Sequence, residues 1–248
     1  MEEWSVSAAI EGKAILVTGA ARGIGQALVT EALRRGARRV YAGTRRPYTH
    51  PDARVTPLAL DVTDLDQIQA AAEQVEALDI LVNNAGVFLF DDLGNREAVD
   101  EHLAVNLFGT YHVTQAFLPS LVSSEGAIVN IVSIAALAPI PVTPAYSLSK
   151  AAALSLTQSS RMLLAGQGVR VHAVITGPVD TDMVQALDIP KTAPQSVAHA
   201  IFDAVSNGEE DIFPDPMSQM FRDAWLAGPA KALERQNAAL LQSQPTAS

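Results

Sequence analysis

The chain has no cysteine, and this absence excludes a disulfide framework, a cysteine-ligated metal site and thiol catalysis. The lack is compatible with a cytoplasmic protein, and we expect that location. No stretch approaches the roughly 18 consecutive apolar residues of a membrane-spanning helix, so we expect no membrane partner. The start of the chain, Met1-Glu-Glu-Trp4, is acidic and has no apolar segment, so we expect no secretory signal.

Basic residues are scarce, with 17 Lys and Arg against 27 Asp and Glu, and the formal net charge is −10. This balance disfavours a nucleic-acid partner. The five histidines have no close metal-ligand spacing, so we expect no metal site and interpret them as surface or satisfied core residues. They are His50, His102, His112, His172 and His199.

What the chain does have is 248 residues, 48% of them hydrophobic, which suits one α/β domain over 1–248. Strand and helix patterns alternate along it. We expect strands near 13–19, 40–44, 55–60, 80–82, 127–132, 169–175 and 211–213, and helices near 23–35, 64–77, 95–123, 144–165 and 194–206. Alternation predicts a Rossmann-like, doubly wound parallel sheet with helices on both faces. Residues 216–248 read as a C-terminal helical extension, either a lid or a subunit interface.

A glycine-rich turn, Thr18-Gly-Ala-Ala-Arg-Gly-Ile-Gly25, follows the first expected strand and opens the first helix. Glycines allow a tight turn and close backbone approach, and the helix N-terminus offers free N–H groups to a pyrophosphate. The second strand ends at Thr44-Arg45 without the acidic residue that usually binds the ribose of NAD. Arg45 and Arg22 suit a 2′-phosphate instead. We therefore expect NADP(H) rather than NAD(H).

Tyr146 and Lys150 lie four residues apart, a spacing that places both on one face of a helix. A free tyrosine has a pKa of about 10 and is a poor acid or base at neutral pH. A neighbouring ammonium favours the phenolate. The pair is therefore a candidate proton-transfer device, although the same spacing is common on solvated helix faces.

These features occur in one order with Asn83-Asn-Ala-Gly86 and Ser133. Together they resemble the short-chain dehydrogenase/reductase family, in its compact single-domain form, over roughly residues 12–182. The resemblance implies catalytic roles for Ser133, which would orient a substrate carbonyl, Tyr146, the acid/base, and Lys150, which would bind the nicotinamide ribose and lower the tyrosine pKa. Asn106 would anchor a water in a proton relay.

The resemblance also implies a set of cofactor contacts, shared among the glycine turn, the strand ends and the two catalytic positions. They are Gly19, Arg22, Gly23, Ile24, Gly25, Thr44, Arg45, Asp61, Val62, Asn84, Ala85, Gly86, Tyr146, Lys150 and Thr181. Two departures stand out. Thr176 occupies the place of a frequent proline, and the C-terminus lacks the family's frequent glycine-rich ending, so a homodimer and a homotetramer both stay open.

The function expected from these residues is a carbonyl reductase that uses NADP(H) and takes Tyr146 as proton donor. Its substrate would be an uncharged, fairly apolar aldehyde or ketone, because the expected pocket walls at 87–93, 134–143 and 182–191 are mostly apolar. Two alternatives are an NAD-dependent alcohol dehydrogenase and a non-catalytic dinucleotide-binding sensor. A non-catalytic sensor is expected to lack at least one of Ser133, Tyr146 and Lys150. All three are present, which favours an enzyme.

Overall fold

The computed structural model describes residues 10–242. The acidic start at Met1–Trp4 and the last six residues of the expected C-terminal extension, 243–248, lie outside this range. None of the helices between residues 10 and 242 has the length and hydropathy that a bilayer-spanning segment requires.

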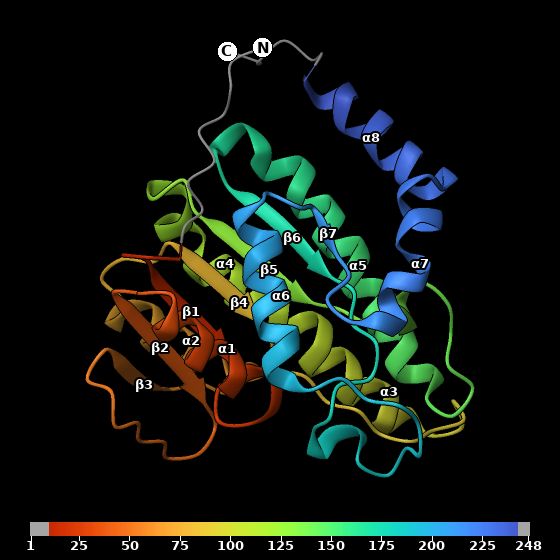
Figure 1. Cartoon of the computed structure of the whole chain (residues 1–248), viewed down its shortest axis with the longest axis horizontal. Coiled ribbons are helices and arrows are strands. Elements are labelled where there is room, and N and C mark those ends of the chain that lie inside the picture. The colour runs from red at the N-terminus through yellow and green to blue at the C-terminus, as the bar shows by residue number, and fades with distance from the viewer. Residues whose placement is uncertain (1–9, 243–248) are drawn as a thin grey trace.

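Within the described residues, seven strands form one parallel sheet in the order β3-β2-β1-β4-β5-β6-β7 (Figure 1). The strands are β1 (Ala14–Thr18), β2 (Arg39–Thr44), β3 (Val55–Ala59), β4 (Ile80–Asn83), β5 (Ala127–Ile131), β6 (Arg170–Val174) and β7 (Asp211–Ile212). The chain order reverses its direction between β1 and β4, and the carboxyl ends of the strands share one edge of the sheet. This arrangement confirms the predicted Rossmann-like fold, in which ligands bind at the carboxyl edge of the sheet.

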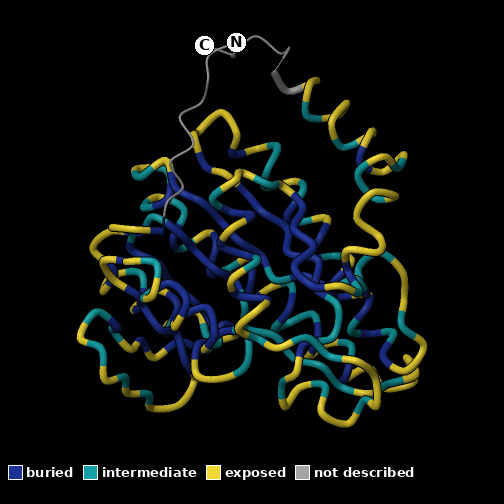
Figure 2. Tube along the Cα trace, viewed as in Figure 1, coloured by how far each residue is buried: buried dark blue, intermediate teal, exposed yellow. Residues whose placement is uncertain are grey.

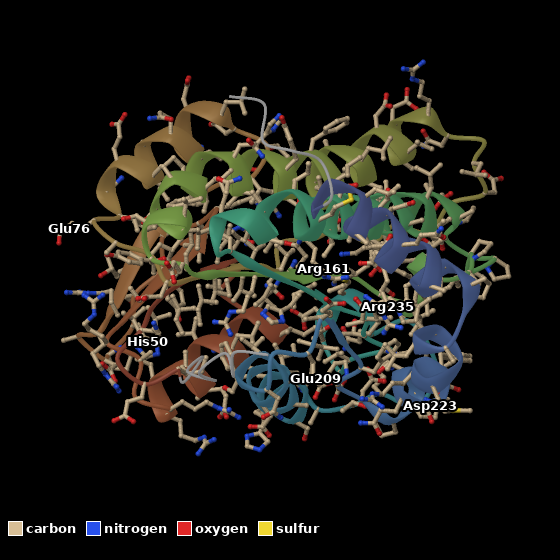
Figure 3. The ribbon with its side chains drawn as sticks, turned by 90° about the horizontal axis from the view of Figure 1, so that it is seen from above. His50, Glu76, Arg161, Glu209, Asp223 and Arg235 are labelled. Atoms are coloured by element: carbon tan, nitrogen blue, oxygen red, sulfur yellow. The ribbon has the colours of Figure 1, made fainter. Side chains whose placement is uncertain are left out.

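Helices cover both faces of the sheet, as the edge-on view shows (Figure 3). The helices α1 (Gly23–Arg34) and α6 (Pro194–Ser206) pack on one face. The helices α2 (Leu65–Gln74), α4 (Thr110–Ser123) and α5 (Pro144–Leu164) cover the other. Apart from the edge strand β3, the strands are buried almost throughout, which explains why they read as apolar runs rather than as alternating patterns (Figure 2).

The helix expected over 95–123 is divided. It consists of α3 (Arg96–His102), a π-helical segment η1 (Leu103–Gly109) and then α4. A π-helical turn inserts one extra residue into the helical repeat and is frequent at functional sites. Here the π-helical segment contains Asn106. The side chains that follow it therefore point in other directions, relative to those before it, than they would in a regular α-helix.

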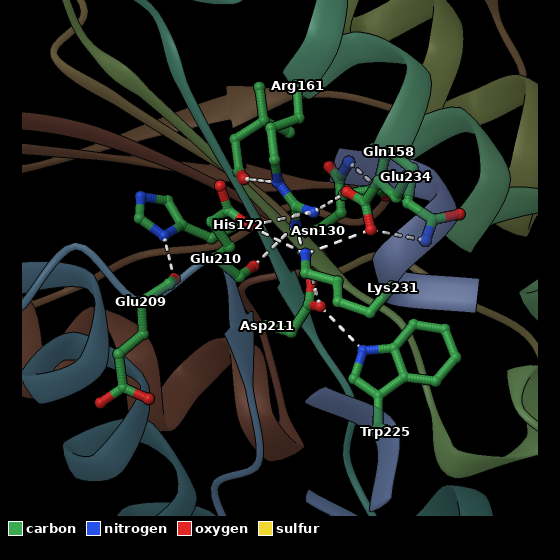
Figure 4. A network of polar contacts seen from close by, with 12 residues as sticks. Asn130, Gln158, Arg161, His172, Glu209, Glu210, Asp211, Trp225, Lys231 and Glu234 are labelled. Atoms are coloured by element: carbon green, nitrogen blue, oxygen red, sulfur yellow. Dashed lines mark hydrogen bonds and ion pairs between the residues drawn. The ribbon is translucent and has the colours of Figure 1, made fainter. Parts of the chain in front are cut away.

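The C-terminal extension begins with α7 (Pro216–Leu226) and α8 (Pro229–Gln242). These helices lie beyond β7 at the edge of the molecule (Figure 1). A buried polar cluster attaches them (Figure 4). In it, Lys231 of α8 contacts Asp211 of β7 at 2.9 Å, and Arg161 of α5 contacts both Asp211 at 2.8 Å and Glu234 of α8.

Candidate active site

In the glycine turn between β1 and α1, a side chain on any of the three glycines would be strained or would meet neighbouring atoms. Gly19 and Gly23 have φ angles of 65° and 55°, in the left-handed region. A Cβ on Gly25 would lie 2.2 Å from the carbonyl oxygen of Gly19. Arg22 is the N-cap of α1, and its side chain makes no capping hydrogen bond. The turn therefore presents backbone N–H groups at a helix N-terminus, which fits a pyrophosphate.

The segment after β4 is fastened to this turn. The hydroxyl of Thr18 accepts hydrogen bonds from the N–H groups of Asn84 at 3.0 Å and of Ala85 at 2.9 Å. The amide of Asn84 donates back to the carbonyl of Thr18 at 2.8 Å. A Cβ on Gly23 would lie 3.0 Å from Cγ2 of Thr181. The structure thus brings the turn, Asn84-Ala85 and Thr181 together, although they are far apart in the sequence.

The end of β2 carries the residues expected to select the cofactor. Thr44 is buried, and its hydroxyl donates to the carbonyl of Arg46 at 2.8 Å. Arg22 faces Asp182 at 3.5 Å in an exposed ion pair. Arg45 is exposed and makes no ion pair with any residue in the range 10–242. Of the two candidate guanidinium groups, Arg45 is therefore the one without a competing carboxylate.

Asp61 and Val62 follow β3 at the same edge of the sheet. The Asp61 carboxylate accepts from the N–H of Thr63 at 2.9 Å and from its hydroxyl at 2.8 Å. Asp64, rather than Asp61, caps α2. Val62 is buried, and its side chain fills the space beside Gly109, where a Cβ would lie 2.6 Å from Cγ2. The Asp61 carboxylate thus stabilises the turn that follows β3, at the carboxyl edge of the sheet.

Ser133 and Tyr146 meet beyond the carboxyl end of β5. Ser133 is buried and caps a short 3₁₀ turn, with its Oγ accepting from the N–H of Ala135 at 3.1 Å. Pro144 opens α5 at a position where a missing N–H costs nothing, so Tyr146 lies in the first turn of the helix. Burial raises the pKa of the Tyr146 phenol to about 12, and its hydrogen bond with Ser133 opposes this effect.

Lys150 lies one turn further along α5 and is buried. Its Nζ donates to the carbonyl oxygen of Ile131 at 2.8 Å and lies 5.7 Å from the centre of the Tyr146 ring. Burial lowers the pKa of Lys150 to about 8. In this structure burial dominates the pKa of the Tyr146 phenol, and the expected lowering of that pKa by Lys150 stays a prediction. The shared helix face is confirmed.

Asn106 is buried beside Lys150. Its Oδ1 accepts from the N–H of Val87 at 2.9 Å, and its Nδ2 donates to the carbonyl of Val87 at 3.1 Å and to Oγ of Ser149 at 2.9 Å. Both amide hydrogens are used, whereas Oδ1 has a second lone pair. A Cβ on Gly86 would lie 3.2 Å from Oδ1 of Asn106 and 3.8 Å from Nζ of Lys150. Gly86 therefore leaves the space between these two residues open.

An aromatic side chain lies against Tyr146. The Phe88 ring contacts the Tyr146 ring edge-on, with centroids 5.0 Å apart. Leu137 and Trp225 of α7 both pack against a small buried cluster that includes Val132 and Leu154. Among residues 10–242, no group of three or more acidic or histidine side chains is arranged to hold a metal ion.

The loop after β6 is stabilised without the proline that Thr176 replaces. Thr176 is buried, and its carbonyl accepts from the N–H of Ile134 at 2.9 Å. The N–H of Gly177 donates to Asp215 at 2.7 Å. Asp215 also caps α7, so its carboxylate joins the loop to the C-terminal helices. The sequence contains no local signal for this contact, which spans 38 residues.

Comparison with known proteins agrees with this geometry. The family model described as short chain dehydrogenase matches residues 13–191. The chain is 38% identical over 208 residues to 2-(R)-hydroxypropyl-CoM dehydrogenase from Xanthobacter autotrophicus, covering 74% of this chain and 81% of the relative. It is 34% identical over 194 residues to the 3-oxoacyl-(acyl-carrier-protein) reductase FabG of Thermotoga maritima, covering 72% and 78%.

A solved structure of a short chain dehydrogenase from Burkholderia cenocepacia in complex with NADP is similar throughout. It superposes with a TM-score of 0.84 at 37% identity, covering 92% of this chain and 98% of the other. Sequence motifs, sheet order and these similarities agree. The chain belongs to the short-chain dehydrogenase family of oxidoreductases.

Proposed function

We propose that this protein is an NADP(H)-dependent reductase that converts an aldehyde or ketone to an alcohol, with Tyr146 as the proton donor. The observation that carries the proposal is the hydrogen-bonded pair of Ser133 and Tyr146 at the carboxyl end of β5. Lys150 lies beside the pair, and the glycine turn lies at the same edge of the sheet. A hydride acceptor and a nucleotide would therefore meet in one crevice.

The cofactor fits the residues present. Gly19, Gly23 and Gly25 leave room that any Cβ would fill, and the uncapped start of α1 suits a pyrophosphate. Arg45 would hold a 2′-phosphate, and Thr44 would fix the turn beside it through its bond to the carbonyl of Arg46. When bound, NADPH supplies the hydride. The relative from Burkholderia cenocepacia holds NADP, which supports the preference over NAD.

The chain's own residues supply position and a proton. The hydroxyls of Ser133 and Tyr146 would donate hydrogen bonds to the carbonyl oxygen and stabilise the charge that grows on it. Because burial raises the pKa of Tyr146 to about 12, the phenol is protonated at neutral pH and is ready to act as an acid. A protonated phenol can donate the proton that carbonyl reduction requires, whereas alcohol oxidation requires a base. Lys150 and a water held at Asn106 would return the proton.

The substrate proposed is uncharged and fairly apolar, because the Phe88 ring lies against that of Tyr146 and the segments 87–93 and 134–143 are mostly apolar. The names of two relatives indicate oxidation of an alcohol in one case and reduction of a 3-oxoacyl group in the other. An NAD-dependent alcohol dehydrogenase is therefore the second candidate. A non-catalytic sensor is disfavoured, because serine, tyrosine and lysine are all present and in contact range.

A panel of aldehydes and ketones from acetaldehyde to benzaldehyde, assayed with NADPH and with NADH, tests the proposal. We expect Tyr146→Phe to lower kcat by about 100-fold or more, while NADPH binding, followed by its fluorescence, changes little. Retained turnover in this variant would remove Tyr146 from the mechanism. Wild-type protein that reduces no compound with either cofactor would overturn the proposed function.

Subunits are proposed to pair through the outer faces of η1, α4 and α5, as a homodimer or homotetramer. Large apolar side chains are exposed there, namely Phe108, Tyr111, Leu148 and Leu163. Met220 and Phe221 are exposed on α7, so the extension stays a candidate interface or lid. Light scattering measures the assembly directly, and a monomer at micromolar concentration would contradict this pairing.

A further inference from the structure

The segment from Val87 to Asp91, here called the 87–91 strap, leads away from β4 past Tyr146. It forms no strand. The N–H of Asp91 donates to the carbonyl of Val142 at 3.3 Å, and side chains bond the backbone groups of Val87 and Leu89. Asn106 bonds both the N–H and the carbonyl of Val87, at 2.9 and 3.1 Å. The N–H of Leu89 donates to Nε2 of His102 at 3.0 Å, and the carbonyl of Leu89 accepts from the hydroxyl of Thr143 at 2.8 Å.

These contacts orient the side chains of the strap. Alternate residues of an extended chain point to opposite sides. The backbones of Val87 and Leu89 are bonded, while Phe88 contacts the Tyr146 ring edge-on at 5.0 Å. Phe90 continues the aromatic wall, with its ring 5.5 Å from that of Phe88. The position of Phe88 against Tyr146 therefore depends on how firmly Leu89 is held.

His102 is the buried group that holds the N–H of Leu89. Its ring is completely buried in the last turn of α3, with its centroid 6.0 Å from that of Tyr146. Nδ1 lies 2.7 Å from the carbonyl oxygen of Ala98, which accepts but does not donate. Nδ1 therefore carries the hydrogen, and Nε2 has the free lone pair that receives the N–H of Leu89. The contacts assign the neutral Nδ1–H tautomer.

His102 and Asn106 are four residues apart, and both side chains bond the backbone of the 87–91 strap. The π-helical segment begins immediately after His102. The two side chains bond Leu89 and Val87, which are two residues apart in the strap. Asn106 is one of the family positions, whereas His102 has no role in the expected set. Its contact with Leu89 is a feature of this chain's own residues.

We propose that His102 is a positioning residue for the reductase reaction: as the Nδ1–H tautomer it fixes the peptide of Leu89 and so keeps Phe88 packed against Tyr146. This inference rests on the proposed function. His102 does not touch the substrate or move a proton. It holds the wall against which the Tyr146 ring is oriented, so that the phenol points at the substrate oxygen beside Ser133.

Two substitutions of His102 test the role. His102→Phe keeps an aromatic ring but removes the acceptor, so we expect kcat to fall about 10-fold or more through misplacement of the tyrosine, with NADPH affinity within about 2-fold of wild type. His102→Gln provides an amide oxygen for the N–H of Leu89, so we expect it to recover much of that loss. His199→Phe is the matched control, because His199 lies on α6 on the other face of the sheet and pairs with Glu31 and Asp203, and we expect wild-type kinetics.

The tautomer gives a second measurement that does not depend on activity. Nitrogen-15 NMR of the wild-type protein at neutral pH is expected to show a protonated Nδ1 and an unprotonated Nε2 for His102. The opposite tautomer would overturn the proposal, and so would folded His102→Phe protein with wild-type kcat or His102→Gln no better than His102→Phe. If His102→Phe does not fold, His102→Gln and the NMR result decide. Inactive wild-type protein would overturn the proposed function, whereas active wild type with an indifferent His102→Phe overturns this role alone.

Discussion

The ammonium of Lys150 donates a 2.8 Å hydrogen bond to the carbonyl oxygen of Ile131, the last residue of β5. The contact fixes Lys150 at the strand end where Ser133 and Tyr146 meet. The lysine is buried and makes no ion pair within the described residues, so its charge is held by a peptide carbonyl and by the face of the Tyr146 ring. The charge of Lys150 is therefore expected to depend on pH within the range in which the enzyme is assayed.

The first prediction concerns this charge. Burial lowers the pKa of Lys150 from 10.5 to about 8, so the ammonium is present below pH 8 and is lost above it. We expect kcat/KM for carbonyl reduction to be level below pH 8 and to fall above it. Lys150→Arg keeps its charge at every accessible pH, so its residual activity is expected to lack this alkaline fall. A profile between pH 5.5 and 10 measures both; the same fall in both proteins would contradict the assignment.

The second prediction concerns cofactor choice. Arg45 is exposed at the end of β2 and has no ion pair within the described part of the chain, so its guanidinium is available for a 2′-phosphate. Loss of one charge-assisted contact is worth about 1.5–3 kcal/mol, so Arg45→Ala is expected to raise the KM for NADPH about 10-fold or more and to leave the KM for NADH unchanged.

The control for this variant is Arg96→Ala, which removes an exposed arginine paired with Asp100 on α3. We expect it to change neither KM. An unaltered NADPH KM in Arg45→Ala would favour the alternative that the protein uses NAD(H), or that Arg22 provides the charge in spite of Asp182.

The sequence predicted the order of the elements well, for a physical reason. Buried parallel strands such as β5 are mostly apolar runs, and helices between them begin at recognisable residues such as Asp64 and Pro144. The spacing of Tyr146 and Lys150 predicted a shared helix face, because helical geometry is local. Local signals of this kind survive folding unchanged.

What the sequence did not predict depends on contacts between distant segments. The π-helical segment around Asn106 was not predicted, because 95–123 was expected as one helix and no residue there signals the extra residue. The high pKa of Tyr146 follows from burial, which only the assembled walls produce. His102 was interpreted as a surface or core histidine, and its partner Leu89 lies 13 residues away in a loop. No spacing rule connects such residues.

The third prediction concerns the attachment of the C-terminal helices. The ammonium of Lys231 is 1% exposed and contacts Glu210 at 2.8 Å, Asp211 at 2.9 Å and Glu234 at 3.1 Å. Removing one partner of a buried ion pair leaves uncompensated charge and costs about 3–5 kcal/mol. Lys231→Met is therefore expected to lower the free energy of unfolding by about 3 kcal/mol, measured by urea denaturation.

Arg235→Met is the control for Lys231→Met, because Arg235 lies one turn further along α8 and is exposed. We expect it to change stability by less than about 0.5 kcal/mol. Equal effects of the two substitutions would indicate that the polar cluster of Arg161, Asp211, Lys231 and Glu234 does not hold α8 in place.

The fourth prediction concerns acid stability. His172 of β6 is buried, its Nδ1 contacts the carbonyl of Glu209 at 2.6 Å, and its Nε2 has no partner within the described residues. Burial lowers the pKa of the imidazole from 6.5 to about 4. Above pH 6.5 the side chain is neutral in both the folded and the unfolded chain. Between pH 6.5 and 4 the unfolded chain binds a proton that the folded chain does not, so stability falls as the pH falls.

A difference of about 2.5 pKa units corresponds to about 3 kcal/mol of stability lost by pH 4. His172→Gln has no titrating group, so we expect its free energy of unfolding to depend less on pH in this window, whatever its value at pH 7. Urea denaturation of both proteins at several pH values between 7 and 4 gives the two slopes. The carboxylate of Glu31, with its pKa lowered to about 2 by Arg34, contributes mainly below this window and equally in both proteins. Parallel curves for wild type and variant would mean that the buried imidazole gains a proton in the folded state, and that the strand around His172 opens to water as the pH falls.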